Sequence, residues 1–598
     1  MPCAVLLLHG YYYYPFISDD ALISLRYAMR LLEGNGLSWN DGMPVEGYSN
    51  LAWVLLASAL GKLGMDLIDA VRVLGFGCFA AVMYINYRLW RHDQGLSAGQ
   101  LLASQLFLAL CAPIAIWSVG GLEQPLVALC MVAAVFFVFR YTRTGHLADI
   151  VYASLGLAVL CITRPDGPLL CLALAIGLFW NKKFDIQASW RPVLLLALAP
   201  VVFVAGQLLF RLHYYGEWVP NTAYIKLTPS YNMAIDGLLY WFQGFVFMLP
   251  WSFLFVRQFF FRDKSLLRQP LVQLILPVVI LWLVYLVAIG GDIFPGLRHF
   301  VVIIALLYLL MPQLIKSLKQ SGWLDKRKVV MATVVFFILV QFASISSLTA
   351  KFERWEWHGQ VLANVLTTAF SEEQPLLAVS AAGTLPYFTG FPAIDMLGLN
   401  DHYIARNPVG ISSDEPTGHG HVNAPYVLGQ KPDIVAFCMP NRRKGDKPCH
   451  YAEEQLYNKQ AFRDNYTLIR VTGYKPYQYS NWLWFYRNSN KIGIEKTDQQ
   501  WLIPGYFFAG DGQSRARLNP ESKLSAVLTD ETPLLVRDLD FELENEQSLQ
   551  LLRVQIKAGG SVDYQLTKQD DGNFAIKLAV SESVDANEIL VESVTVSW

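Results

Sequence analysis

Residues 192–210 read PVLLLALAPVVFVAGQLLF and contain no charged side chain. A helix of this length extends about 28 Å, which matches the hydrocarbon core of a bilayer. The stretch therefore predicts a membrane-spanning helix. Comparable apolar runs lie on both sides of it, at 70–90, 100–118, 124–141, 147–162, 168–180, 237–257, 270–290, 299–317 and 329–348. Because one soluble core would not need so many such runs, residues 1–350 are predicted to form a polytopic α-helical membrane domain.

The composition of the whole chain agrees with a membrane protein. Of the 598 residues, 54% are hydrophobic and only 16% are charged, whereas a soluble domain has about 25% charged residues. The mean hydropathy is +0.33, and 47 basic against 48 acidic side chains give a net charge of −1. These values exclude a disordered chain, a collagen-like chain and a strongly basic nucleic-acid binder, so the bilayer is the expected environment and no nucleic-acid partner is expected.

The loops between the apolar runs fall into two alternating sets. The basic set is 88–91, 140–143, 182–191, 257–268 and 316–328. The other set is 119–123, 163–167, 211–236 and 291–298. Since Lys and Arg are enriched in cytoplasmic loops, the second set, the loop 18–69 and all residues after 350 are predicted to face the opposite side. Residues 3–17 are expected to be the outer end of a first helix, and 51–66 a re-entrant or interfacial helix.

The last 250 residues have a different pattern. Residues 351–500 contain short apolar strands among polar loops, which predicts an extracytoplasmic mixed α/β domain. Residues 501–598 show alternating strands separated by turns, which predicts a β-sandwich-like module, carbohydrate-binding-like in its strand pattern. In this module 16 acidic side chains stand against 8 basic ones. Cys438 and Cys449 lie in the α/β domain and would be able to pair in an oxidising compartment.

Two adjacent acids follow the first apolar segment. Asp19 or Ser18 would suit a helix N-cap, and this structural role competes with a chemical one. Capping does not easily explain both Asp19 and Asp20 beside a bilayer. Two neighbouring carboxylates favour proton uptake by one of them, which suits proton abstraction from a hydroxyl. Arg26 lies on the same predicted helix and would neutralise the acids or bind an anion.

Further basic and acidic groups belong to the same predicted face. Arg164 and Asp166 share a short turn, for which an internal ion pair bracing two helices is the structural alternative. Lys226 ends one outer loop, and Arg298 lies in another. Because Arg and Lys suit phosphate, the sequence favours a lipid-linked phosphosugar whose tail lies in the bilayer. A transporter would instead be expected to place such groups at mid-membrane.

The ordered motifs resemble the GT-C membrane glycosyltransferases, in the branch of the mycobacterial terminal arabinofuranosyltransferase and the pilin arabinosyltransferases. The resemblance covers about residues 15–490. The motifs that carry it are DDALISLRY at 19–27, VEGYSN at 45–50, GLE at 121–123, TRPDG at 163–167, YYGEWVPNT at 214–222, GD at 291–292, DMLGLND at 395–401 and GH at 418–419. After the last of these, Gly420 and His421 stand where relatives tend to have Glu and Lys.

The resemblance implies a transferase that moves D-arabinofuranose from a polyprenyl-phosphate donor to an extracytoplasmic glycan or pilin acceptor. It gives Asp20, or else Asp19, the role of general base, and Asp20 is preferred because Asp19 would be the better cap. The residues implied at the donor phosphate are Arg164, Lys226, Arg298, His299 and Arg26. Those implied at the sugars or the acceptor are Glu46, Asn50, Trp53, Glu123, Asn221, Asp292, Asp395 and Asn400.

Other functions stay open from the sequence. A GT-C enzyme for another sugar, such as mannose, would use similar groups. A polysaccharide transporter, flippase or scaffold would instead carry ionisable residues along a mid-membrane path. Adjacent carboxylates are able to hold a divalent cation, but no chelating spacing appears, and we predict metal independence and no cofactor. The resemblance implies a multi-pass protein of a bacterial inner membrane, with the active site on the periplasmic side.

Overall fold

The computed structural model describes residues 1–226, 232–412, 415, 418–438, 447–497, 499–509, 514–528, 534–539, 553–568, 574–580 and 589–597. These residues form two compact units. The first comprises Met1–Trp39, Glu46–Ala223 and Leu227–Glu353. The second comprises Asn40–Val45, Tyr224–Lys226 and Arg354–Trp598.

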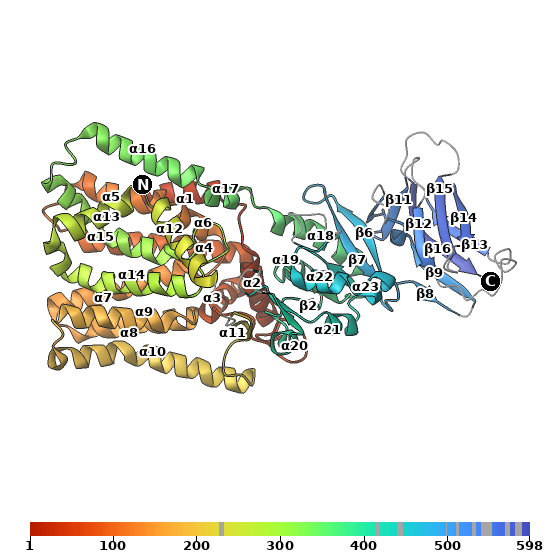
Figure 1. Ribbon diagram of the computed structural model, residues 1–598, viewed down its shortest axis with the longest axis horizontal. Helices are drawn as coiled ribbons and strands as arrows, with labels where there is room; N and C mark the ends of the chain where they lie inside the picture. The colour runs from red at the N-terminus through yellow and green to blue at the C-terminus, as the bar shows by residue number, and fades with distance from the viewer. Residues whose placement is uncertain are drawn as a thin grey trace. The chain divides into compact units, whose positions relative to one another are not determined.

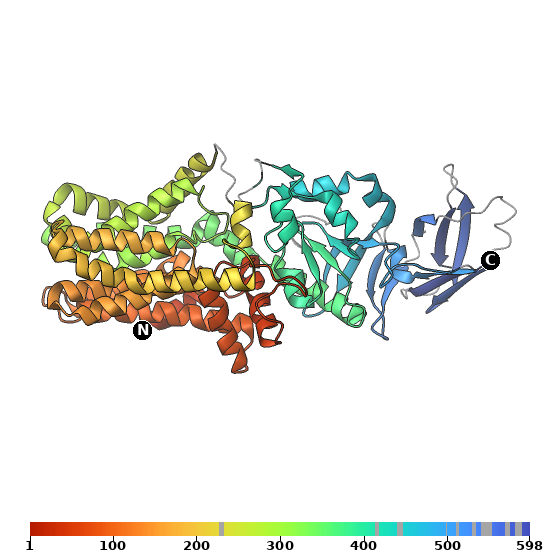
Figure 2. The same ribbon diagram turned by 90° about the horizontal axis from the view of Figure 1, so that it is seen from below.

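The long helices of the first unit run side by side, and the shorter α2 and α3 lie at one end of them (Figures 1 and 2). The helices of the unit have the following bounds. They are α1 (Pro2–Tyr12), α2 (Asp19–Leu32), α3 (Leu51–Lys62), α4 (Leu67–Trp90), α5 (Ala98–Leu110), α6 (Ala112–Val119), α7 (Gln124–Thr144), α8 (Leu147–Thr163), α9 (Gly167–Asn181), α10 (Ile186–Tyr214), α12 (Asn232–Phe247), α13 (Trp251–Val256), α14 (Pro270–Ala288), α15 (Phe300–Gln320), α16 (Arg327–Ala343) and α17 (Ile345–Phe352). Helix α11 (Asn221–Lys226) begins in the first unit and ends in the second.

Helix α10, which contains residues 192–210, shows why this unit belongs in a membrane. Only 11% of its most apolar window is buried, and Leu194, Val201 and Leu209 are each at least 60% exposed. Such a surface would be strongly unfavourable in water, because each exposed leucine or valine forgoes about 1.5–3 kcal/mol of transfer free energy. The side chains therefore require lipid around them.

Among the described residues, five helices are long and apolar enough to span a bilayer, or eight if each bent pair is one span. The predicted spans 147–162 and 168–180 are the shorter apolar helices α8 and α9. The predicted span 237–257 bends by 91° between Phe247 and Trp251, where Pro250 removes a backbone donor. The twelve-residue helix α3 is too short to span, in agreement with an interfacial position.

Contacts within the bundle connect loops of the same set. Lys316 Nζ lies 2.9 Å from Asp93, and Asn181 donates to Gln273 at 2.9 Å. In the other set, Ser18 Oγ donates to the carbonyl of Gly120 at 3.2 Å. Trp117 likewise donates to the carbonyl of Gly296 at 3.1 Å. The two sets separated by Lys and Arg content therefore lie at opposite ends of the helices.

The second unit is built around one long sheet (Figure 1). Its parallel strands are β2 (Ala393–Asp395), β1 (Leu377–Val379) and β5 (Ile434–Ala436), followed by the antiparallel β7 (Tyr479–Tyr486) and β6 (Tyr466–Gly473). The described helices of this part are α18 (Trp355–Phe370), α19 (Thr384–Thr389), α20 (His402–Arg406), α21 (Ala424–Gly429), α22 (Tyr451–Tyr457) and α23 (Gln460–Asn465).

The sheet continues past the expected boundary at residue 500. Strand β10 (Arg515–Leu518) pairs with β6, and the sheet extends through β11 (Leu524–Leu528), β16 (Ile589–Ser597), β9 (Gln500–Pro504) and β8 (Glu495–Lys496). A separate three-stranded sheet holds β12 (Leu534–Leu539), β15 (Phe574–Val580) and β14 (Val562–Lys568), while β13 (Arg553–Ala558) pairs with β16. The residues after 500 form strands as expected, but several of these strands continue the sheet of the α/β domain. The sequence did not predict this, because a strand pattern does not identify the strand with which it pairs.

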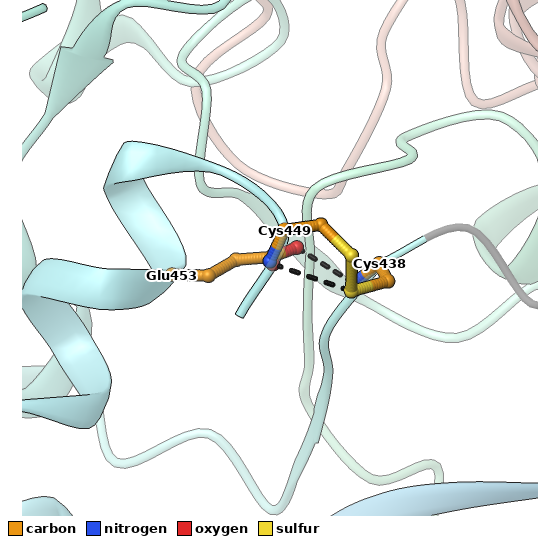
Figure 3. Close-up of side chains that lie close together, drawn as sticks. All are labelled: Cys438, Cys449 and Glu453. Carbon is orange, nitrogen blue, oxygen red and sulfur yellow. Dashed lines mark hydrogen bonds between the residues drawn. A yellow bond between two sulfur atoms is a disulfide. The ribbon is translucent and has the colours of Figure 1, made fainter. Parts of the chain in front are cut away.

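Cys438 and Cys449 form a disulfide, which confirms the pairing considered from the sequence. Glu453 of α22 lies against it (Figure 3), and its carboxylate accepts hydrogen bonds from the backbone N–H groups of Cys438 at 2.7 Å and Cys449 at 2.6 Å. The three residues are close enough for a metal site. Since the two sulfurs are bonded to each other, they are not thiolate ligands, and the group is a structural brace.

Candidate active site

Helix α2 presents the adjacent acids. Ser18 occupies the N-cap position in an extended conformation, and Asp19 and Asp20 begin the helix, where its positive end favours carboxylates. The expectation that Asp19 would be the better cap is wrong: the N-cap residue is Ser18, whose hydroxyl donates to the carbonyl of Gly120 and accepts no capping hydrogen bond from the helix. Asp19 is 8% exposed, whereas Asp20 is only partly buried. Asp20 is thus preferred for its accessibility.

Arg298 is held by Asp292 at the same end of the bundle. Its Nε donates to Asp292 at 2.9 Å and its Nη2 at 2.7 Å. Burial lowers the pKa of Arg298, but Asp292, with help from Asp20 and Glu123, outweighs it and raises the pKa. Arg164 is also close enough to act on this charge. Asp20, Glu123, Arg164 and Arg298 therefore form one electrostatic cluster.

Arg164 forms ion pairs with two acids, Glu123 of the cluster and Asp166 of its own turn. Its Nη2 lies 2.7 Å from Asp166, and its Nη1 lies 2.7 Å from Glu123. Asp166 also accepts from the hydroxyl of Tyr285 at 3.2 Å. Burial acts to raise the pKa of Glu123, but Arg164 and Arg298 lower it below its usual value. The ion pair proposed as a structural alternative is therefore present, and it lies inside the candidate site.

Asn50 connects the acids to helix α2. Its amide donates to Glu123 at 2.9 Å and to Ser24 at 3.1 Å. Asn50 is 3% exposed. Glu123, Asn50 and Ser24 therefore support the positions of Arg164 and α2 from inside the protein.

The cluster keeps hydrogen-bonding capacity for a ligand. A guanidinium has five N–H donors. Among the described residues, Arg298 gives hydrogen bonds only to Asp292, through Nε and Nη2, so Nη1 has none. Within the same described set, the Asp20 carboxylate accepts no hydrogen bond, although it acts on the charge of Arg298. A cation with unused donors and an open carboxylate thus lie close together.

Three predicted site residues have other roles in the structure. Arg26 is 1% exposed, and its Nε donates to the carbonyl of Trp39 at 2.8 Å. Trp53 is fully buried and donates to the carbonyl of Gly121 at 2.8 Å. Glu46 is paired with Arg211 of α10. Burial raises the pKa of Glu46, against the opposing effect of Arg211.

These contacts give each of the three residues a structural role inside the protein. Motifs rich in polar and aromatic residues indicate loops of complex shape as readily as sugar contacts, and spacing does not separate the two.

Of the remaining predicted residues, His299 and Asn221 belong to the first unit and Lys226 belongs to the second. His299 is 6% exposed, and its backbone N–H donates to the hydroxyl of Tyr240 at 3.2 Å. Asn221 is 3% exposed and starts α11, where its backbone N–H donates to the carbonyl of Glu46 at 2.9 Å. Lys226 ends α11, but its side chain lies outside the described residues.

Asp395 and Asn400 belong to the second unit and bind each other. Asp395 accepts from the backbone N–H of Leu397 at 3.0 Å, and from the backbone and the side chain of Asn400 at 2.9 and 3.0 Å. Complete burial raises the pKa of Asp395 to about 7 despite these donors. The pair closes the turn after β2, and this turn is its evident role.

Several residues of the site were not found from the sequence. Tyr285 and Tyr240 lie within apolar spans, where a single tyrosine has no distinctive spacing. Arg211 ends a span and reads as an ordinary interfacial charge. Ser24 lies in the DDALISLRY motif, four residues after Asp20 on the same helix. This spacing places Ser24 on the same face of α2 as Asp20, and it is the feature of the sequence that could have identified Ser24.

Fold and site together define a polytopic helical membrane protein that has a C-terminal α/β domain and a buried ionic cluster at one end of its bundle. The chain is similar to the terminal β-(1→2)-arabinofuranosyltransferase of Mycobacterium tuberculosis, with 27% identity over 257 residues, 41% of this chain and 39% of that protein. It is 22% identical to the enzyme of the same name from Corynebacterium glutamicum over 472 residues, 71% of this chain and 66% of that protein.

The chain thus spans less than two thirds of the length of these curated relatives. Residues 350–486 match a family model described as a domain of unknown function (DUF8728). Among solved structures, ArnT from Cupriavidus metallidurans bound to undecaprenyl phosphate aligns with a TM-score of 0.48 at 12% identity, over 65% of this chain and 84% of that one. The arabinosyltransferase EmbB from Mycobacterium smegmatis aligns with a TM-score of 0.36 at 13% identity, over 100% of this chain and 64% of that one.

Proposed function

We propose that this protein is a GT-C-type glycosyltransferase that moves D-arabinofuranose from a polyprenyl-phosphate donor to a glycan or a glycoprotein such as pilin. The observation that carries the proposal is the cluster in which the charges of Asp20 and Arg164 both act on that of Arg298, at one end of an apolar bundle. The choice of sugar is supported by the names of the two curated relatives.

The proposed reaction is a single group transfer. The acceptor hydroxyl oxygen bonds to the anomeric carbon of the donor sugar, and the bond from that carbon to the phosphate oxygen breaks. The hydroxyl proton passes to the Asp20 carboxylate, and the phosphate leaves as polyprenyl phosphate with one additional negative charge. The open Asp20 carboxylate suits this role because a base must be within reach of the proton that it removes.

The two arginines stabilise the leaving phosphate. Asp292 fixes Arg298 through one edge of the guanidinium and leaves Nη1 for a phosphate oxygen. Asp166 and Glu123 hold all three nitrogens of Arg164, so this residue contributes through its positive charge. Preorganised donors of this kind cost no reorganisation as charge develops, which is the largest contribution in many transferases. Apolar helices next to the cluster accommodate the prenyl chain.

The site and the second unit are proposed to lie on the periplasmic side of a bacterial inner membrane. Two observations support this topology. The basic loops gather at the end of the bundle opposite to the cluster, as the positive-inside rule requires. The disulfide between Cys438 and Cys449 suits an oxidising compartment.

The donor is tested by supplying synthetic polyprenyl-phosphoryl sugars to the purified full chain in lipid nanodiscs. Arabinofuranose is expected to be transferred or hydrolysed at least tenfold faster than mannose, and polyprenyl phosphate should appear in equal amount. Faster turnover of mannose would assign the protein to a different sugar. Turnover of none of the donors, by protein that is correctly folded, would contradict the proposed activity.

A further inference from the structure

Two cysteines face each other beside the arginine turn. Cys161 lies on the last turn of α8 and Cys171 on the second turn of α9. Their Sγ atoms are 3.5 Å apart. The residues between them include Arg164 and Asp166 of the cluster, which end α8 and precede α9. The turn that carries these two residues therefore lies between the two cysteines along the chain.

The close approach of the two helices explains this geometry. A Cβ on Gly167 would lie 2.7 Å from the Cα of Cys161 and 3.0 Å from the carbonyl oxygen of Leu160. The first turn of α9 thus packs directly on the backbone of α8 at Cys161. Because the missing side chain of Gly167 permits this contact, the two sulfurs meet one helical turn further along α9. Cys161 is 4% exposed and Cys171 is partly exposed, so Cys171 is the more accessible sulfur of the two.

We propose that Cys161 and Cys171 are a disulfide-forming pair that fastens the turn carrying Arg164. The sulfurs need to approach by about 1.5 Å to reach bonding distance, a movement that side-chain rotation and a slight shift of the helix ends supply. With a disulfide oxidant such as oxidised glutathione, the Cys171 thiolate attacks one glutathione sulfur and releases glutathione. The Cys161 thiolate then attacks Cys171 Sγ and releases the second glutathione. The two thiol protons end on the two released glutathione molecules, whose disulfide bond breaks as the bond between Cys161 and Cys171 forms.

The remaining four free cysteines provide an internal comparison. Cys3, Cys78, Cys111 and Cys130 are free in the structure, and among the described residues no second thiol is recorded in hydrogen-bonding contact with any of them. The hydrogen bond of Cys3 goes to the Met83 sulfur at 3.9 Å. Cys130 lies near enough to Cys78 and Cys161 for an electrostatic interaction, but the recorded contact between two thiols is the one between Cys161 and Cys171. Oxidation is therefore expected first at the pair that brackets the turn.

The test is to treat the full chain in detergent with oxidised glutathione, denature it, alkylate the remaining thiols and map the peptides by mass spectrometry. Cys161 and Cys171 are expected in one linked peptide, so that four cysteines are alkylated instead of six. Cys161→Ser should retain glutathione on Cys171 instead of forming a link. The thermal unfolding midpoint should rise on oxidation of the wild type and stay unchanged in Cys161→Ser.

Alkylation of both cysteines after oxidation would overturn the proposal, as would separate glutathione adducts on each of them. This readout needs no transfer activity, so its failure is distinct from a failure of the proposed glycosyltransferase function.

Discussion

The role of Arg298 depends on which of its nitrogen atoms are already used. Asp292 occupies Nε and Nη2, so replacement by Lys keeps a charge but removes the fixed fork of donors. Losing one charge-assisted hydrogen bond costs about 1.5–3 kcal/mol. Arg298→Lys is therefore expected to raise the KM for the donor about ten- to a hundredfold, measured by initial rates against donor concentration. An unchanged donor KM would remove Arg298 from the phosphate site.

Replacing Trp53 distinguishes between a structural role and a sugar-binding role for this residue. Its indole N–H donates to the Gly121 carbonyl, and the ring is fully buried. Trp53→Phe should lower the stability by about 1–3 kcal/mol, since a buried acceptor is left unpaired. The acceptor KM of the folded protein should stay unchanged. An increase in acceptor KM without a loss of stability would restore Trp53 to the sugar site.

Asp395 predicts a dependence of stability on pH. The ordinary carboxyl pKa of 3.8 applies to the unfolded chain, and burial raises the value in the folded protein to about 7. The folded state then binds the proton more tightly, so stability falls as the pH rises from about 4 through 7. Asp395→Asn should flatten this decline, measured by hydrogen exchange of residues 395–400 with correction for the intrinsic exchange rate. An equal slope in both proteins would contradict the raised pKa.

The residues that formed the cluster were predictable as a group. Few charged residues lie at the ends of the apolar runs, and those of the cluster are Asp20, Arg164, Asp292, Arg298 and Glu123. Placing a charge near the membrane costs free energy, so such residues are candidates for function. Their mutual pairing was not predictable, because it depends on side-chain directions across four loops. For the same reason Glu46 and Trp53 were assigned to sugars, although they are bonded to Arg211 and Gly121.

At the level of elements, the hairpin of α8 and α9 positions Arg164. Gly167→Ala places a Cβ within 2.7 Å of the Cα of Cys161, and backbone does not yield as a flexible side chain would. Overpacking of this kind typically costs about 1–3 kcal/mol. The variant should separate the helix ends and reduce turnover at least tenfold, measured together with its thermal unfolding. Gly145→Ala is not a matched control, since Gly145 has a positive φ of 72°.

Gly156→Ala on α8 provides a better control, because the added Cβ would lie 3.6 Å from the carbonyl oxygen of Cys130, at ordinary contact distance. It is expected to leave turnover and stability near the wild-type values. Equal turnover in Gly167→Ala and Gly156→Ala would show that the hairpin contact does not position the arginine turn.

Elements were easier to predict than their connections. The apolar runs all became helical segments because twenty apolar residues without charges have few alternatives in a membrane. The breaks within them, such as the 91° bend before Trp251, follow from local backbone and packing that hydropathy does not encode. In the second unit, the strands after residue 500 were expected, but their pairing with β6 through β10 was not.

At the scale of the whole molecule, the two units differ in the environment that their surfaces require. The first unit exposes apolar helices that require lipid, and it concentrates its few buried charges at one end. The second unit is a sheet-based domain braced by a disulfide, as expected for a compartment in which thiols are oxidised. A lipid-linked donor and a water-soluble acceptor need these two environments, and the ionic cluster is where the proposed transfer would take place.

The most direct test of this account is the turnover of Asp20→Asn with polyprenyl-phosphoryl arabinofuranose, compared with Asp19→Asn as the neighbouring control. Loss of a general base costs about a hundred- to ten-thousandfold in rate. We predict that Asp20→Asn loses at least a hundredfold in kcat while its thermal unfolding and donor KM stay near wild type, and that Asp19→Asn loses much less. Normal kcat in Asp20→Asn would contradict the central claim.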